Sequence, residues 1–236
     1  MNAGPVEPLG EAAWLLRWPG PVGLETNRRV HALARRLQAD APQWLDGLVP
    51  AYASLAVLVR PEALDRFDAI GEALAALLEE DAGTDDVVPG EPLVLPVCYD
   101  PDFAPDLDAV CHRLELRRDQ FIAAHAAAGY EVAMIGFAPG FTYLLGLPES
   151  LAVPRLETPR TRLEAGSVGI GGNQTGVYPA PGPGGWRLVG RTPLRLFMPG
   201  HRQPCRFRAG DRVRIEPVDR ARFEDIARAP GGIAHD

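Results

Sequence analysis

The stretch from Gly136 to Thr192 holds the side chains of this sequence that are best suited to binding a small molecule. Glycines and prolines interrupt it every few residues, and aromatic, arginine, glutamine and threonine residues lie between them. Proline fixes the backbone angle φ, whereas glycine allows positive φ and lets two backbones approach closely. The stretch also contains apolar segments typical of β-strands, which a flexible linker lacks. We therefore expect a rigid surface built from loops.

Two Pro-Arg pairs in this stretch are typical of an anion site. Arg155 and Arg160 each follow a proline, which stiffens the backbone that presents the guanidinium. A guanidinium offers five N–H donors in a planar fork that suits a carboxylate or a phosphate. Arg191, near the end of the stretch, can join them. The alternative is that either Arg155 or Arg160 is a solvated surface arginine.

Neutral side chains of the same stretch can line such a site. The candidate substrate-binding residues are Phe137, Pro139, Gly140, Phe141, Tyr143, Arg155, Gln174, Thr175, Tyr178, Trp186 and Thr192. The segment FAPGF predicts a type II turn at Pro139-Gly140, and its flanking aromatic residues can also be core. Trp186 either forms the floor of a pocket or belongs to the core. A phenol such as Tyr143 normally seeks a polar partner.

His125 completes the candidate catalytic set with Arg160 and Arg191. It lies late in a predicted helix that Gly129 ends, directly before the strand that delivers GFAPGF. One interpretation is a site residue, because the helix leads directly into that strand. The alternative is a histidine placed at the helix C-terminus because the negative end of the helix dipole favours it.

Several familiar motifs are incomplete. The run GIGGNQTG has Gln174 where a dinucleotide fingerprint needs glycine, and AGSVG has Ala165 where a nucleophile elbow needs glycine. The sequence has no lysine, so a Walker-type phosphate loop is excluded. No pair of histidines or cysteines has metal-ligand spacing, so we predict no metal site.

The composition of the sequence indicates which partners and which cellular compartment to expect. A formal net charge of -7 argues against nucleic acid as a partner. Three scattered cysteines indicate a reducing compartment rather than a disulfide framework. The N-terminus lacks the features of a signal peptide, and no apolar run approaches the ~20 residues that span a bilayer. We expect a cytoplasmic protein that does not bind membranes.

The first half of the sequence predicts a small α+β domain. A strand over 9–18 precedes a helix capped by Thr26, in which apolar residues recur with helical spacing. Two strands around Pro50 and a helix that starts at Pro61 follow. This order is part of a ferredoxin-like pattern. The acidic run at 79–92 is the best boundary, which gives domains at 1–88 and 89–236, although an exposed loop inside one domain is the alternative.

The second half predicts a mainly β domain. After one strand and two short helices, the segments YEVAMIGF, SVGIGG, GVYPA, WRLVGRT, LRLFM, CRFRAG and DRVRIEPV read as short strands. Many short strands with closely spaced turn signals indicate a barrel or a sandwich.

The motifs of the glycine-rich stretch also resemble a known family. In order, GFAPGFTYL, two Pro-Arg pairs, AGSVGIGGNQTGVYP, PGGW and GRTP are similar to the allophanate hydrolase subunit 1 family. This family includes the B-type component of bacterial 5-oxoprolinase and inhibitors of sporulation kinases. The match extends upstream through CYDPDFAPDLDAV, and more weakly into the N-terminal half. The acidic insertion at 79–92 fits loosely.

The resemblance implies that the mainly β domain is a cyclophilin-like barrel. It implies partners too, namely a second cyclophilin-like component of the C type and a further oxoprolinase component of the A type. The activity implied first is that of one component of an ATP-dependent 5-oxoprolinase, which opens 5-oxo-L-proline to L-glutamate. The cofactors would be ATP, shared with the partner chains, and its Mg²⁺. The alternatives are an inhibitor of a sensor histidine kinase and a component of allophanate or urea metabolism.

Overall fold

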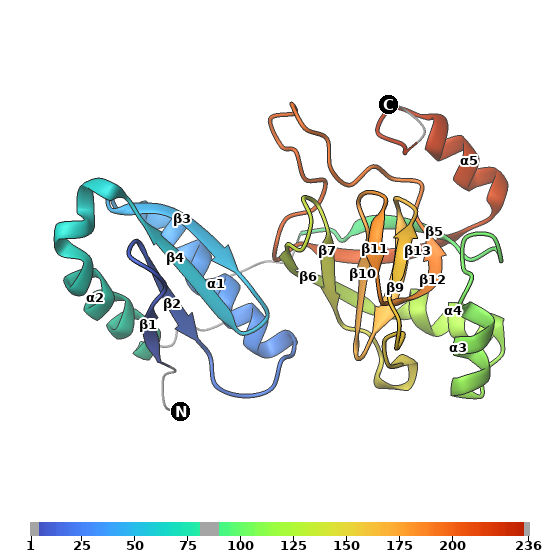
Figure 1. Cartoon of the computed structure of the whole chain (residues 1–236), viewed down its shortest axis with the longest axis horizontal. Helices are drawn as coiled ribbons and strands as arrows, with labels where there is room; N and C mark the ends of the chain where they lie inside the picture. Colours follow the sequence, from blue (N-terminus) through green and yellow to red (C-terminus); the bar gives the residue numbers. More distant parts are fainter. Residues whose placement is uncertain (1–4, 81–89, 234–236) are drawn as a thin grey trace. The chain divides into compact units, whose positions relative to one another are not determined.

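A computed structural model describes residues 5–80 and 90–233, which fall into two compact units, Met1–Pro89 and Gly90–Asp236. Figure 1 draws the first unit in blue to teal and the second in green to red. The boundary predicted between residues 88 and 89 lies outside the described residues.

The N-terminal unit is a four-stranded antiparallel sheet with two helices. Its elements are β1 (Val6–Pro8), β2 (Ala13–Arg17), α1 (Leu24–Asp40), β3 (Leu45–Pro50), β4 (Ser54–Val59), the 3₁₀ helix η1 (Pro61–Arg66) and α2 (Phe67–Glu79). The strand order is β1-β2-β4-β3. Alternate residues of β2 and β4 point to one face, where Trp14 pairs with Val57 and Leu16 with Leu55. Both helices cover this face with buried apolar residues.

The ferredoxin-like assignment of this unit stays a prediction. The expected order of strand, helix, strand, strand and helix is present from β2 to α2. The fourth strand of the sheet is β1, which precedes β2 in the chain and pairs with it. The expected strand over 9–18 is shorter in the structure, since residues 9–12 form the turn between β1 and β2.

The second unit contains a closed barrel of seven strands. Its elements are β5 (Leu93–Cys98), α3 (Leu107–Leu114), α4 (Arg118–Ala127), β6 (Gly129–Ile135), β7 (Thr142–Leu145), η3 (Glu149–Leu151), β8 (Arg160–Leu163), β9 (Ser167–Gly171), β10 (Gln174–Val177), β11 (Gly182–Gly184), β12 (Arg187–Arg191), β13 (Arg212–Val218) and α5 (Arg220–Arg228). Around the barrel the order is β10-β7-β6-β13-β5-β12-β9. Strands β5 and β13 are parallel, and the other neighbours are antiparallel. The predicted barrel is therefore confirmed.

Branched aliphatic side chains fill the barrel. Val168 and Ile170 on β9 and Val177 on β10 are completely buried in its core. Strand side chains alternate between two faces, so their neighbours Gly169, Gly171 and Gly176 lie on the outer face of the wall. Strands β8 and β11 form a separate two-stranded sheet outside the barrel. This sheet and the glycine-rich wall position the candidate site.

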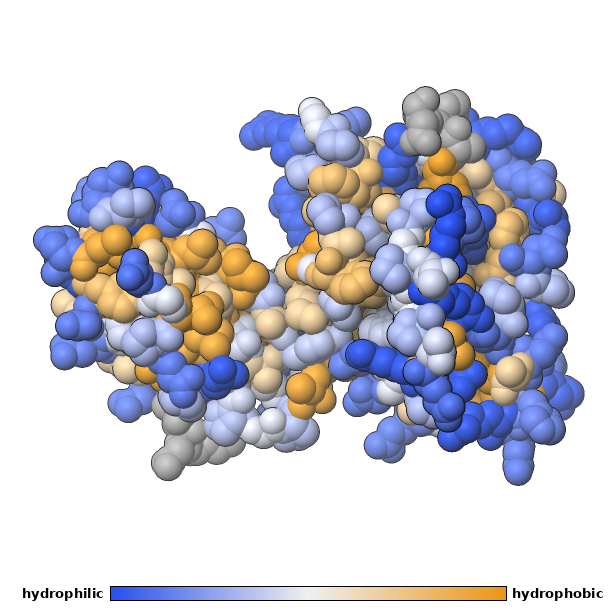
Figure 2. All heavy atoms as spheres, in the orientation of Figure 1, coloured by the Kyte–Doolittle hydropathy of each residue, from blue (hydrophilic) through white to orange (hydrophobic). Residues whose placement is uncertain are grey.

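The surface differs between regions of the barrel unit. Figure 2 shows hydrophilic side chains around much of its outer margin, and both apolar and strongly hydrophilic side chains on the face between. In the part of the chain that the structure describes, no helix combines the length and apolar character that a membrane crossing requires.

Candidate functional site

The site begins with one rung of residues on the outer wall of the barrel. Tyr143 on β7 pairs with Gly176 on β10, which pairs with Gly169 on β9, which pairs with Leu188 on β12. Two adjacent glycines in the middle of a rung leave a trough, because neither carries a side chain. The motif that resembles a dinucleotide fingerprint therefore serves close packing here.

Trp186 occupies this trough. An added Cβ would lie 2.8 Å from the indole at Gly171, 3.0 Å from it at Gly176, and 3.0 Å from the Trp186 Cβ at Gly169. A Cβ as close as 2.8 Å essentially never occurs in real structures, and one at 3.0 Å requires its neighbour to shift. Trp186 is only 5% exposed. The glycines thus fix the indole against bare backbone.

Phe141 is the centre of an aromatic cluster above the trough. Its ring centroid lies 4.5 Å from that of Tyr143, 4.8 Å from Tyr178 and 5.8 Å from Trp186, mostly in edge-to-face geometry. Such pairs contribute about 0.5–1.5 kcal/mol each beyond burial. Leu163 and Leu188 complete this second core outside the barrel.

The loop before Phe141 has the predicted Pro-Gly turn. The Phe141 amide donates to the Ala138 carbonyl at 2.9 Å, and Gly140 has φ of +83°. Phe137 has φ of +70°, which is unusual for a residue with a side chain, and it is 70% exposed. The loop therefore holds an aromatic ring at the rim of the cluster rather than burying it.

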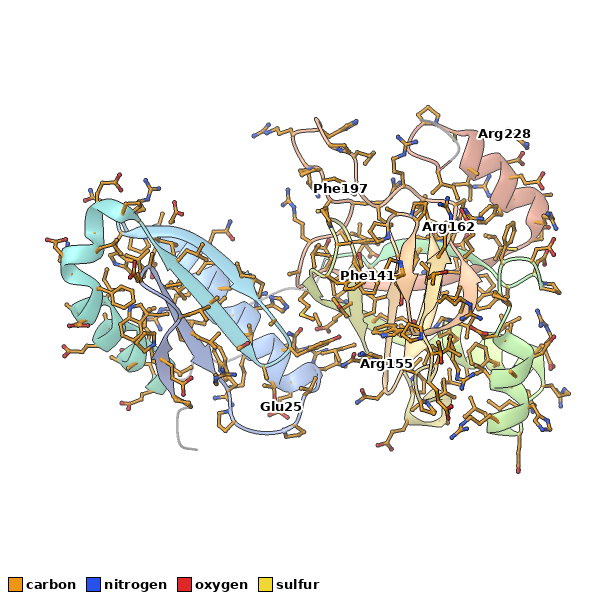
Figure 3. All side chains as sticks on the ribbon, viewed as in Figure 1. Glu25, Phe141, Arg155, Arg162, Phe197 and Arg228 are labelled. Atoms are coloured by element: carbon orange, nitrogen blue, oxygen red, sulfur yellow. The ribbon has the colours of Figure 1, made fainter. Side chains whose placement is uncertain are left out.

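A pocket of about 310 Å³ opens beside the aromatic cluster. It is lined by Phe137, Phe141, Tyr143, Arg155, Leu156, Pro159, Tyr178, Pro183, Gly184, Gly185 and Trp186. Arg155 is exposed at the rim, with its guanidinium carbon 5.5 Å from the indole centroid of Trp186. Figure 3 labels Arg155 and Phe141 on the barrel unit. The volume suits a small molecule.

Burial raises the pKa of both tyrosines that line the pocket. For Tyr178, the Trp186 backbone and the cations Arg155 and Arg160 partly oppose this rise. For Tyr143, Arg155 partly opposes it. Both phenols are therefore neutral at pH 7, and neither adds negative charge to the pocket.

The structure brings six of the predicted site residues to the pocket. They are Phe137, Phe141, Tyr143, Arg155, Tyr178 and Trp186. Five further lining residues were not predicted, namely Leu156, Pro159, Pro183, Gly184 and Gly185. All five lie in the segments PRLETPR and PGPGGW, next to the predicted Arg155, Arg160 and Trp186, and this proximity is the signal that could have identified them.

The other predicted binding residues support the wall instead of lining the pocket. Pro139 and Gly140 form the turn, and Gln174 belongs to β10. Thr175 is buried with its hydroxyl donating to the Gly169 carbonyl at 2.9 Å. Thr192 is also buried, and its hydroxyl oxygen accepts from the Leu194 amide at 3.4 Å.

Arg160 forms an ion pair at the edge of the pocket. Its Nη2 lies 2.7 Å from Oδ1 of Asp106, whose Oδ2 accepts from the Leu188 amide at 2.7 Å. The Asp106 amide in turn donates to the Leu188 carbonyl at 3.0 Å. Asp106 is 8% exposed. Arg160 therefore ties β8 to β12, and Pro159 beside it lines the pocket.

Arg160→Ala is expected to destabilise the barrel unit by about 2 kcal/mol, because it leaves a largely buried carboxylate without its cation. Denaturant unfolding measures this loss. The matched control is Arg162→Ala on the same strand, whose exposed side chain lies 3.7 Å from Glu164 and should contribute less than about 0.5 kcal/mol. Equal unfolding midpoints for both variants would contradict the structural role of the Asp106 pair.

Arg191 lies outside the pocket lining. Its Nε donates to the Ala165 carbonyl at 2.8 Å, and its guanidinium stacks over Phe103 at 5.8 Å. Partial burial lowers its pKa. These contacts hold the loop between β8 and β9 against β12.

His125 is completely buried in the barrel unit, between Phe121, Tyr99 and Tyr130. Its Nδ1 lies 2.7 Å from the Tyr99 hydroxyl, and Tyr130 donates to its carbonyl oxygen at 2.9 Å. Nε2 has no partner among the described residues. Burial lowers the pKa of His125 to about 3, so the ring is neutral at pH 7.

No group of three or more His, Cys, Asp or Glu side chains within residues 5–80 and 90–233 is arranged to hold a metal ion. The pocket instead combines aromatic walls with one cation. This arrangement can bind a flat, weakly polar ring that carries a negative charge.

Comparison with known proteins places the chain in a family. The family model for the carboxyltransferase domain, subdomains C and D, matches residues 5–207. The chain is 41% identical to the B-type component of 5-oxoprolinase from Escherichia coli O157:H7, over 89% of this chain and 94% of that protein. It is 37% identical to the corresponding B-type component from Bacillus subtilis, over 89% of this chain and 91% of that protein.

Solved structures share the fold. The structure of TTHA0988 superposes with a TM-score of 0.75 at 36% identity, covering 88% of this chain and 40% of that longer chain. The urea amidolyase of K. lactis superposes with a TM-score of 0.67 at 17% identity, covering 93% of this chain and 15% of that chain. The second likeness concerns fold alone. From the family model and the curated relatives together, the chain belongs to the family of carboxyltransferase domains, subdomains C and D, and is similar to B-type components of 5-oxoprolinase over about nine tenths of its length.

Proposed function

We propose that this chain is the B-type component of an ATP-dependent 5-oxoprolinase, which opens 5-oxo-L-proline to L-glutamate together with partner chains. The observation that carries the proposal is the match to proteins named as the B-type component of 5-oxoprolinase, at 37–41% identity over nearly the whole of both chains. The pocket on the barrel wall is the candidate site of this chain. Its volume and aromatic lining suit a substrate of this size.

The reaction explains the need for ATP and for other chains. Water must add to the carbonyl carbon of the lactam, and the ring C–N bond must break. ATP, with its Mg²⁺, would supply activation of the amide oxygen by phosphorylation. The residues of this chain would bind and orient the substrate. We propose the A-type and C-type components as the partners that complete the complex.

The contacts of the three residues predicted as catalytic favour structural roles for them. Arg160 is committed to Asp106, Arg191 to a carbonyl and Phe103, and His125 is enclosed by the barrel unit. We therefore propose that Arg160 positions the pocket wall, and that Arg191 and His125 stabilise the fold. The substrate would then be bound by the six predicted residues that line the pocket.

The other functions suggested by the sequence gain less support. A role in urea or allophanate metabolism rests on a likeness at 17% identity, which shows the fold alone. No contact or charge of the described residues favours a kinase as the partner over another component of the enzyme.

The test is 5-oxoproline-dependent ATP hydrolysis by this chain co-expressed with a C-type and an A-type partner, each omitted in turn. We expect hydrolysis to be lost when this chain is left out. A well-formed complex that hydrolyses no ATP with 5-oxoproline would refute the proposed function.

A further inference from the structure

The pocket contains a cation that no anion of the protein neutralises. Arg155 is the one charged side chain among the described residues that line it. Within residues 5–80 and 90–233 its guanidinium makes no ion pair or hydrogen bond, and its contact is the face of Trp186. By contrast, Arg160 is paired with Asp106, and Arg187 donates to the Pro154 carbonyl at 3.0 Å. The Arg155 fork is therefore available to a ligand.

The other residues in and near the pocket determine which ligand charge it can accommodate. Both pocket tyrosines are neutral at pH 7, since burial raises the pKa of each. Arg160 nearby is already balanced by Asp106 at 2.7 Å. The pocket thus presents a single uncompensated positive charge, which matches one carboxylate. A triphosphate carries several negative charges and is normally held by lysine and by backbone amides at a helix N-terminus.

The lining also sets the ligand's shape. Trp186 and Phe141 are buried and held in place, the first by three glycines and the second by its edge-to-face neighbours. Prolines 159 and 183 add stiff walls at the rim. Stiff apolar walls in a volume of about 310 Å³ favour a small flat ring over an extended chain.

We propose that this pocket is the subsite for the cyclic amide acid itself, with the ligand carboxylate on Arg155 and the ring against Trp186 and Phe141. The nucleotide then binds on another chain of the complex. This inference rests on the proposed function, because the identity of the acid as 5-oxoproline comes from it. The guanidinium can donate to both oxygens of one carboxylate while it stays stacked on the indole.

The experiment titrates the full chain, alone and in the assembled complex without ATP, with 5-oxo-L-proline. Calorimetry measures affinity, and tryptophan fluorescence reports on Trp186. We expect saturable binding, with a fluorescence change that Trp186→Phe removes. Arg155→Ala should weaken binding at least about tenfold, since a charge-assisted bidentate contact is lost. Arg162→Ala, an exposed arginine outside the lining, should leave affinity unchanged. 2-Pyrrolidone, which lacks the carboxylate, should bind at least about tenfold more weakly.

Three results would overturn the inference. The first is the absence of 5-oxoproline binding in both the chain and the complex. The second is equal affinity in the Arg155→Ala variant. The third is competition by ATP for the same fluorescence change, which would make the pocket a nucleotide site. A complex that hydrolyses ATP with 5-oxoproline while the pocket binds none refutes this inference and leaves the proposed function standing. If this chain binds 5-oxoproline but ATP hydrolysis continues when this chain is omitted, the proposed function is refuted instead.

Discussion

Gly171→Ala is expected to destabilise the barrel unit by about 3 kcal/mol and to reduce 5-oxoproline-dependent ATP hydrolysis at least about tenfold. The new methyl group would lie 2.8 Å from Cδ1 and Nε1 of Trp186. The indole is 5% exposed and packs against Phe141, so it cannot move aside without losing its contacts with the barrel wall. Denaturant unfolding and the coupled ATPase assay measure the two effects.

A matched variant and a double variant separate crowding from other causes. Gly182→Ala, on β11 next to the pocket, adds a methyl group that meets no atom within 4 Å and should be nearly neutral. Trp186→Leu should recover much of the stability lost in Gly171→Ala, because the smaller side chain makes room. It should not recover activity, since the pocket loses its floor. Wild-type stability in Gly171→Ala alone would show that the indole is not held as described.

The barrel unit is expected to lose about 4 kcal/mol of stability as pH falls from 7 to 3, because of His125 alone. Burial lowers the pKa of this histidine from 6.5 to about 3 in the folded chain. Below pH 6.5 the unfolded chain binds a proton that the folded chain does not, so stability falls until the folded pKa is reached. Thermal unfolding of the full chain across this range measures the slope.

His125→Asn is the variant that tests the assignment. Asparagine places a neutral polar atom near the position of Nδ1, where Tyr99 needs a partner. We expect lower stability at pH 7, because of the volume lost, but a shallower fall toward pH 3 than in the wild type. A variant whose stability falls as steeply as the wild type would assign the acid sensitivity to other groups.

The barrel and the aromatic lining could be predicted from the sequence because both leave local signals. Short alternating strands indicated the barrel, and the concentration of glycine, proline and aromatic residues marked the pocket. Phe141 and Trp186 were found in this way. The same reasoning could not assign their roles, since a buried aromatic residue of the core and one of a pocket floor have the same local sequence.

The arginines show what the sequence could not reveal. Arg155 and Arg160 both follow a proline, yet Arg155 forms no ion pair among the described residues, whereas Nη2 of Arg160 is paired with Asp106. The difference is Asp106, which lies 54 residues away and reaches Arg160 through the folding of α3 onto β12. Likewise the enclosure of His125 depends on Tyr99, which lies 26 residues away in the chain. Long-range pairing of this kind leaves no periodic pattern.

The glycines of the outer wall also affect solvent protection. Where β9 and β10 carry Gly169 and Gly176 side by side, no side chain of their own shields the ladder between the strands. The Trp186 ring provides that shield from outside. Amide hydrogen exchange along this ladder should therefore follow the opening of a single side chain rather than global unfolding. In Trp186→Ala, faster exchange confined to β9 and β10 would make these amides a local probe of whether the pocket floor is in place.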